Sequence, residues 1–76
     1  MPRLSLSFRE FIRIIEAHGF TFHDQGATSH RRYRGVVNGK VQIVVVAYHN
    51  LSDDIKSGTL DSMIRQSGLP KKVFRK

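Results

Sequence analysis

Apolar residues near the start of the chain recur at the spacing of an amphipathic helix. In residues 7–19 ("SFREFIRIIEAHG") they fall on one helical face, with charged residues between them. Ser7 and Glu10 have the spacing of a capping box, and Gly19 can adopt the left-handed conformation that ends a helix. We therefore predict a helix here, whose buried stripe consists of Phe8, Phe11, Ile12, Ile14 and Ile15.

The next part of the chain alternates apolar and polar residues, which is typical of strands. Residues 20–24 ("FTFHD") alternate Phe20 and Phe22 with polar side chains, predicting a short strand with one apolar face. After a turn at residues 25–28, the segments 29–37 and 40–49 flank Asn38 and Gly39. This pair is the one that most favours a two-residue hairpin turn. We predict three antiparallel strands.

The last third of the chain predicts a loop, a helix and a short final turn. Residues 50–58 have the composition of a connecting loop, and a helix is expected from about Thr59 to Ser67, ended by Gly68. Pro70 can open a last turn. The inward side chains of this region are Leu60, Met63, Ile64, Val73 and Phe74. The order of helix, three strands and helix predicts an α+β fold with both helices on one face of the sheet, in one domain of residues 1–76.

The turn at Asn38 and Gly39 predicts which side chains share a face of the hairpin. With a two-residue turn, His30 lies opposite Ala47, and Arg32 lies opposite Val45. One face then carries Ser29, Arg31, Tyr33, Val44, Val46 and Tyr48. The other carries His30, Arg32, Arg34, Val36, Val41, Ile43 and Val45. Burying a histidine and two arginines without anionic partners costs more than burying the first set, so we expect His30 to point outward.

This arrangement leaves Val41, Ile43 and Val45 exposed in a row beside the basic residues. A contiguous exposed apolar patch is typical of a surface that binds another protein. We therefore expect these three side chains to contact a protein partner. The prediction depends on the strand register, because a shift of one residue exchanges the two faces.

The positive charge of the chain indicates which class of molecule it binds. The formal net charge is +7, from 13 Lys and Arg against 6 Asp and Glu. No acidic residue occurs between Asp24 and Asp53, where four cations gather, namely Arg31, Arg32, Arg34 and Lys40. This concentration predicts a polyanionic partner such as RNA, while the basic residues 71–76 fit a solvated tail equally well.

Several other classes of site and location are excluded by the sequence. There is no cysteine for a disulfide or a thiolate zinc site, and no apolar run long enough for a signal peptide or a membrane span. His18 and His23 lack the spacing of metal ligands, and no phosphate-binding glycine motif is present. We expect a soluble cytosolic protein without metal or cofactor.

His30 is the candidate for chemistry. An outward imidazole between guanidinium groups can move a proton while an RNA 2′-hydroxyl attacks its own phosphate, and this reaction needs no metal. A histidine that only hydrogen-bonds or stacks on RNA is the alternative from composition. His49, at the same end of the hairpin, is either a second acid or base or a residue that caps the loop.

Four segments together resemble the HicA family of bacterial and archaeal toxins, from about Phe8 to Phe74. They are "AHGF", "GATSHRRYRG", "VAYH" and "SGTLDSMIRQSGL". The resemblance implies an mRNA interferase with a double-stranded-RNA-binding-domain-like fold. It implies that His30 is catalytic, with Ser29 and His49 in support. It also implies a HicB-like antitoxin that covers the active face.

Two other functions remain open at this point. The same fold could serve as a non-catalytic RNA-binding module, which would bind RNA without cutting it. An inactive member of the family, kept only for its partner, would show neither cleavage nor toxicity. RNA incubated with the protein in EDTA distinguishes these cases.

Overall fold

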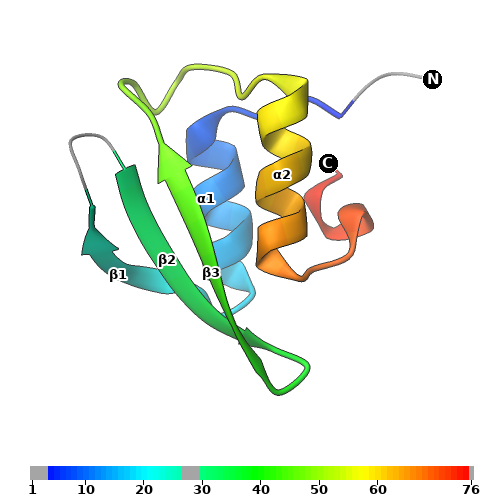
Figure 1. Cartoon of the computed structure of the whole chain (residues 1–76). Helices are drawn as coiled ribbons and strands as arrows, with labels where there is room; N and C mark the ends of the chain where they lie inside the picture. Colours follow the sequence, from blue (N-terminus) through cyan, green and yellow to red (C-terminus); the bar gives the residue numbers. More distant parts are fainter. Residues whose placement is uncertain (1–3, 27–29, 76) are drawn as a thin grey trace.

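A computed structural model describes residues 4–26 and 30–75. The chain forms helix α1 (Phe8–Ala17), strands β1 (Thr21–Gln25), β2 (His30–Val37) and β3 (Lys40–Ala47), helix α2 (Ser57–Ser67) and the 3-10 helix η1 (Lys71–Phe74). The strands form an antiparallel sheet in the order β1-β2-β3, with α1 behind it (Figure 1). The predicted α+β order of helix, three strands and helix is confirmed.

Local signals account for both ends of α1. The Ser7 backbone N–H donates to Oε1 of Glu10 at 2.9 Å, and the Glu10 N–H donates to Oγ of Ser7 at 3.2 Å, which completes the predicted capping box. Gly19, with φ of 92°, adopts the left-handed conformation just after the helix. Phe11, Ile12 and Ile15 are buried, whereas Phe8 and Ile14 are half-buried.

Helix α2 begins at Ser57 rather than at the predicted Thr59. The Leu60 N–H already bonds to the Lys56 carbonyl, at 2.8 Å, so the first turn includes Ser57 and Gly58. Both are common loop residues, and no side chain caps this helix, which explains why the pattern placed its start too late. Its end at Gly68, with φ of 70°, is as predicted.

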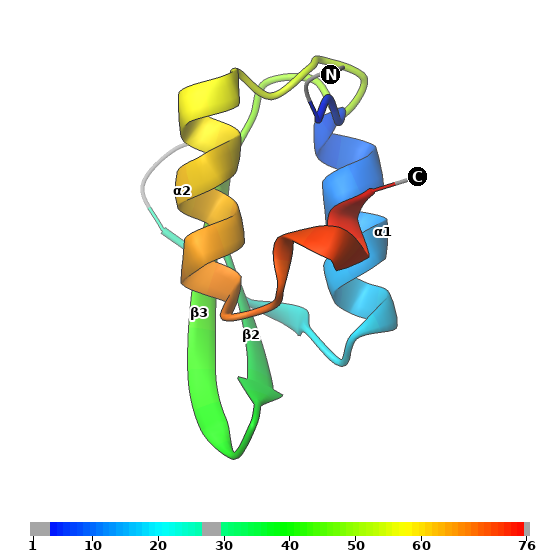
Figure 2. The ribbon, with the colours of Figure 1, turned by 90° about the vertical axis from the view of Figure 1, so that its right-hand side faces the viewer.

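The core lies between α1, the inner face of the sheet, α2 and η1. Figure 2 shows the red 3-10 helix η1 seated against α1, where Phe74 stacks on Phe11 with ring centroids 5.1 Å apart. Tyr33, Val44 and Val46 are buried from the sheet side, and Leu60, Met63 and Ile64 are buried from α2. The inward positions predicted for these elements are confirmed.

The β2–β3 hairpin has the predicted register. Asn38 and Gly39 both have positive φ, and the strands pair so that His30 lies opposite Ala47 and Arg32 opposite Val45. The sheet face turned away from α1 is here called the outer face. It carries every second side chain of each strand of this hairpin, seven in all. They are His30, Arg32, Arg34, Val36, Val41, Ile43 and Val45.

Strand β1 differs from its prediction. Phe20 precedes the strand and is buried, but Phe22 is 53% exposed, so the two phenylalanines do not form one buried face. Phe22 packs edge-on against Tyr33, with ring centroids 5.8 Å apart. The reason is that β1 is an edge strand, and α2 packs along β3 at the opposite edge instead of covering it.

Val45 is also less exposed than predicted. Val41 and Ile43 are exposed, but Val45 is half-buried. Helix α2 runs beside β3, and Oε1 of Gln66 accepts a hydrogen bond from the Val45 N–H at 3.1 Å. The exposed apolar part of the outer face therefore consists of Val36, Val41 and Ile43.

Candidate nucleic-acid interface

His30 is the first residue of β2, and its side chain is exposed on the outer face. Its carbonyl accepts a hydrogen bond from the Gly26 N–H at 2.8 Å, which joins the end of β1 to the start of β2. Because side chains alternate along a strand, Arg32 and Arg34 follow on the same face. The predicted placement of these three side chains is confirmed.

Arg32 has an anionic partner that the sequence analysis did not predict. Its Nε lies 2.5 Å from one carboxylate oxygen of Asp24, and its Nη2 lies 2.9 Å from the other. Asp24 pairs with Arg32 across β1 and β2 because the register shifts between Phe22 and Asp24. The expectation that the arginines of β2 lack carboxylates is therefore wrong for Arg32.

The bulge in β1 causes this pairing. Thr21 and Phe22 pair with Arg34 and Tyr33, and an unbroken register would place His23 opposite Arg32. The extra residue places Asp24 there instead, on the outer face. The alternation of apolar and polar residues does not show where a bulge lies. The only sign of the contact between Asp24 and Arg32 in the sequence is that an acidic residue precedes the hairpin.

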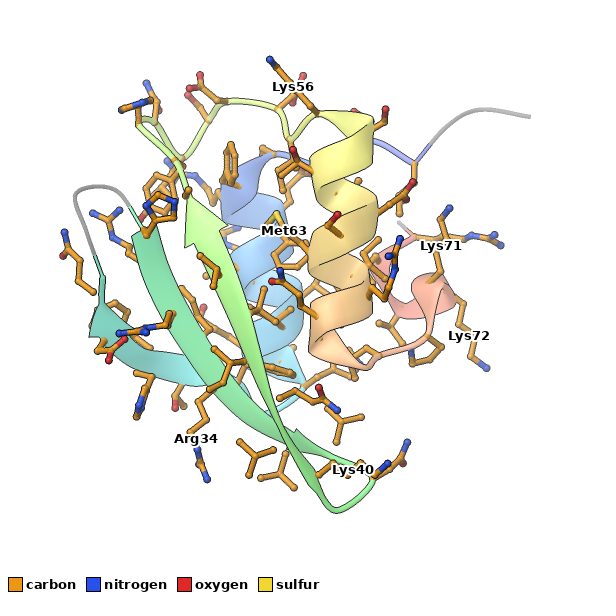
Figure 3. All side chains as sticks on the ribbon, viewed as in Figure 1. Arg34, Lys40, Lys56, Met63, Lys71 and Lys72 are labelled. Atoms are coloured by element: carbon orange, nitrogen blue, oxygen red, sulfur yellow. The ribbon has the colours of Figure 1, made fainter. Side chains whose placement is uncertain are left out.

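The side chains of Arg34 and Lys40 can bind an anion from outside the chain. Neither forms an ion pair with any residue in the part of the chain that the structure describes. Figure 3 shows Arg34 projecting away from the helices and Lys40 at the hairpin end. A phosphate group approaching this end of the sheet would not have to displace a carboxylate from either side chain.

Arg31 faces the other way. It is half-buried, and its guanidinium carbon lies 4.5 Å from the centroid of the Tyr48 ring, a cation–π contact at the margin of the inner face. Tyr48 in turn packs against Phe8, with ring centroids 5.7 Å apart. Arg31 is therefore on the opposite face of the sheet from Arg32 and Arg34, as the predicted register requires.

A family model, that of the HicA toxins of bacterial toxin–antitoxin systems, matches residues 8–69. The chain belongs to the HicA toxin family. The matched range runs from the first residue of α1 to just past α2 and includes the whole sheet. No curated protein and no solved structure gives a significant match.

Membership makes this HicA chain the toxin of a toxin–antitoxin system, with an antitoxin as its partner. The resemblance found from the sequence segments is confirmed. Within the described ranges, no helix is long and apolar enough to cross a membrane.

Of the two residues expected to support His30, which are Ser29 and His49, the structure describes only His49. Ser29 lies outside the described residues. His49 is exposed and follows β3, whose last residue, Ala47, pairs with His30. His30 and His49 are therefore at the same end of the hairpin of this HicA toxin.

Other titratable groups of the toxin are less suited to chemistry. Burial raises the pKa of Tyr33, and its Coulomb interactions with Tyr48 and Glu16 add to this effect, so its hydroxyl is protonated at neutral pH. Nδ1 of His18 lies 2.9 Å from the Ile14 carbonyl, where it caps the end of α1. Residues 4–26 and 30–75 contain no group of three or more His, Cys, Asp or Glu that could hold a metal ion.

Proposed function

We propose that this HicA toxin is an endoribonuclease that cleaves mRNA without a metal ion, with His30 as the group that transfers the proton. The observation that carries the proposal is the exposed position of His30 on an open sheet face, with two arginines following it on the same strand. A strand holds these side chains at fixed spacing, which suits a site that must orient a phosphodiester. An mRNA substrate implies action in the cytoplasm.

The chemistry requires only groups that this face offers. His30 accepts the proton of a ribose 2′-hydroxyl while its oxygen attacks the adjacent phosphorus. The bond from phosphorus to the 5′-oxygen of the next nucleotide breaks, and that oxygen takes up a proton from a second acid, either His49 or water. The products are a 2′,3′-cyclic phosphate and a free 5′-hydroxyl, so no water is consumed in this step.

Cations are needed because negative charge builds up on the phosphate oxygens in the transition state. Arg34 is free of carboxylates among the described residues and is the stronger candidate for this role. Arg32 lies closer to His30 along β2 but must leave Asp24 or bind phosphate with its remaining N–H groups. Ser29 and His49 support the site. Arg31 and Lys40 point to the other face of the sheet, where they hold phosphates further along the RNA.

The partner in this proposal is a HicB-like antitoxin that covers the outer face. Val41 and Ile43, with the half-buried Val45, offer it an apolar contact beside Arg34. A partner seated there would keep RNA from His30, so that inhibition is occlusion.

A non-catalytic RNA-binding module is the second candidate function. The ion pair between Arg32 and Asp24 favours it, because it withdraws one of the two cations closest to His30 along the strand. Such a module would bind RNA through Arg34 and Lys40 and leave it intact.

Incubation of RNA with the purified toxin in EDTA separates the two functions. We expect the wild type to cut, leaving cyclic phosphate ends, and His30→Ala to cut more slowly by roughly 10²-fold or more, because a proton-transfer group is lost. His23→Ala is the matched control, since His23 is also an exposed strand histidine but lies in β1. RNA that is shifted in a native gel but never cut would identify the binding module, and a His30→Ala rate equal to the wild-type rate would remove His30 from the mechanism.

A further inference from the structure

The β2–β3 hairpin extends past the ends of α1 and α2, and β3 is the outermost strand on that side (Figures 1 and 2). An edge strand presents unpaired backbone N–H and C=O groups, which can pair with another strand. The hairpin end is therefore the part of the sheet where a new strand has room to add.

The backbone of β3 shows which groups point outward. The Val45 N–H donates to the Gln66 side chain on α2, so it points away from β2. In an antiparallel pair this direction repeats at every second residue, and the N–H and C=O groups of Val41 and Ile43 must point to the same edge. Among the residues that the structure describes, no group outside the sheet bonds to them.

Helix α2 limits this edge at one end. The Val45 N–H is bonded to the Gln66 side chain. The end of α2 otherwise contacts β3 from the inner face, where an added Cβ at Gly68 would lie 3.0 Å from Nε2 of Gln42. The open edge is consequently short and runs from Val41 to Ile43, next to the turn. A segment of a few extended residues is enough to pair with it.

The side chains along this edge indicate the chemistry of the segment. Val41 and Ile43 are exposed on the outer face together with Val36, which favours apolar side chains on the same face of an added strand. Lys40 faces the other side, opposite Val37, and Arg34 flanks the apolar residues; neither has a carboxylate partner among the described residues. Acidic side chains on the other face of an added strand would neutralise Lys40.

A second copy of this chain fits the edge poorly. Two chains of net charge +7 would bring their Lys40 and Arg34 side chains together, and like charges on neighbouring strands are destabilising. The edge therefore favours a different partner, with the opposite charge.

We propose that the Val41–Ile43 edge of β3 pairs with an extended segment of the antitoxin in which apolar and acidic residues alternate. The apolar side chains of that segment lie beside Val41 and Ile43, and its acidic side chains approach Lys40. The inference rests on the proposed function, because strand addition here anchors the antitoxin next to the face that carries His30. It explains how a partner could be held at this face by backbone bonds as well as by side chains.

Hydrogen–deuterium exchange tests the backbone bonds directly. The probe is the complex of this chain with the protein encoded by the reading frame adjacent to its gene. We expect the Val41 and Ile43 amides to exchange at least about tenfold more slowly in the complex than in the free chain, because a new hydrogen bond protects them. The amides of Tyr33 and Val44, already inside the sheet, are the internal reference.

Two variants at one position separate edge pairing from side-chain contact. Val41→Pro removes the outward N–H without removing a bond to β2, whereas Val41→Ala keeps the N–H and loses apolar surface. We expect about tenfold or greater weakening of the complex by Val41→Pro and less than about threefold by Val41→Ala. Thermal unfolding of the free variants shows whether each is folded, and the exchange measurement decides the question if Val41→Pro is not.

Each outcome bears on a different claim. An adjacent protein that binds and inhibits but leaves the Val41 and Ile43 amides unprotected overturns the edge pairing and leaves the proposed nuclease intact. Protected amides in a chain that never cuts RNA overturn the nuclease and support the edge pairing. Equal losses from Val41→Pro and Val41→Ala in folded variants, or no binding at all, overturn the edge pairing.

Discussion

Arg32 shows how one residue can belong to both a structural contact and a functional surface. Its guanidinium binds Asp24 with two hydrogen bonds, yet both side chains remain nearly half exposed. An exposed ion pair of this kind contributes only about 0.2–1 kcal/mol, because water and salt screen it. A phosphate can therefore compete with Asp24 for Arg32.

Asp24→Asn should strengthen RNA binding by about two- to fivefold at low salt, because Arg32 no longer has to leave a carboxylate. The logarithmic salt dependence should become steeper by roughly 0.7, the contribution of one more phosphate contact on a single strand. Fluorescence anisotropy with a labelled RNA across a salt series measures both. Asp61→Asn is the matched control, since it makes the same charge change on α2, where Asp61 faces Lys71 at 3.8 Å. Equal effects of the two variants would mean that only net charge matters.

At the scale of elements, β2 makes a close contact at Gly35 with Phe20, the residue just before β1. A Cβ at Gly35 would lie 2.7 Å from the Phe20 ring, which is almost fully buried. The glycine therefore allows Phe20 to lie directly on the strand. This packing contributes to the core under the face that carries His30.

Gly35→Ala should lower the free energy of unfolding by about 1–3 kcal/mol, because the Phe20 ring must move in a packed core. Gly58→Ala is the control, since a Cβ in this first turn of α2 meets nothing within 4 Å, and alanine is the better helix former. Urea unfolding followed by circular dichroism compares the two variants with the wild type. A Gly35→Ala variant as stable as the wild type would show that Phe20 repacks without cost.

At the scale of the whole molecule, two pairs of basic residues lie on different sides. Arg34 and Lys40 lie toward the hairpin end of the sheet, while Lys71 and Lys72 lie on η1, beyond α2 from Arg34 (Figure 3). The net charge of +7 attracts RNA to the molecule as a whole, but only the first pair lies on the hairpin, with Arg34 on the outer face and Lys40 beside the turn.

Replacing Arg34 and Lys40 together by alanine should lower the logarithmic salt slope of RNA binding by roughly 1.4, about 0.7 for each lost phosphate contact. Replacing Lys71 and Lys72 together removes the same charge and should leave the slope nearly unchanged. The measurement is the binding constant of a labelled single-stranded RNA at several salt concentrations. If the η1 pair has the larger effect, RNA lies along the C-terminal helix instead.

The sequence by itself determined the order of elements and the faces of the hairpin. Helical spacing and the capping box predicted α1, and the pair Asn38 and Gly39 predicted the turn and with it the pairing of His30 with Ala47. These signals are local, because a turn or a cap involves only residues close in the chain. His30 could therefore be placed on the outer face without the structure.

Tertiary structure alone decided which side chains meet across elements. The bulge in β1 brought Asp24 to Arg32, and the packing of α2 along β3 half-buried Val45 and left Phe22 exposed at the other edge. Each of these contacts depends on how a strand or helix packs against an element distant in the sequence. The alternation of apolar and polar residues along one segment carries no information on this packing. The open edge at Val41 and Ile43 also exists because the side chain of Gln66 on α2 bonds to the edge of β3 only at Val45.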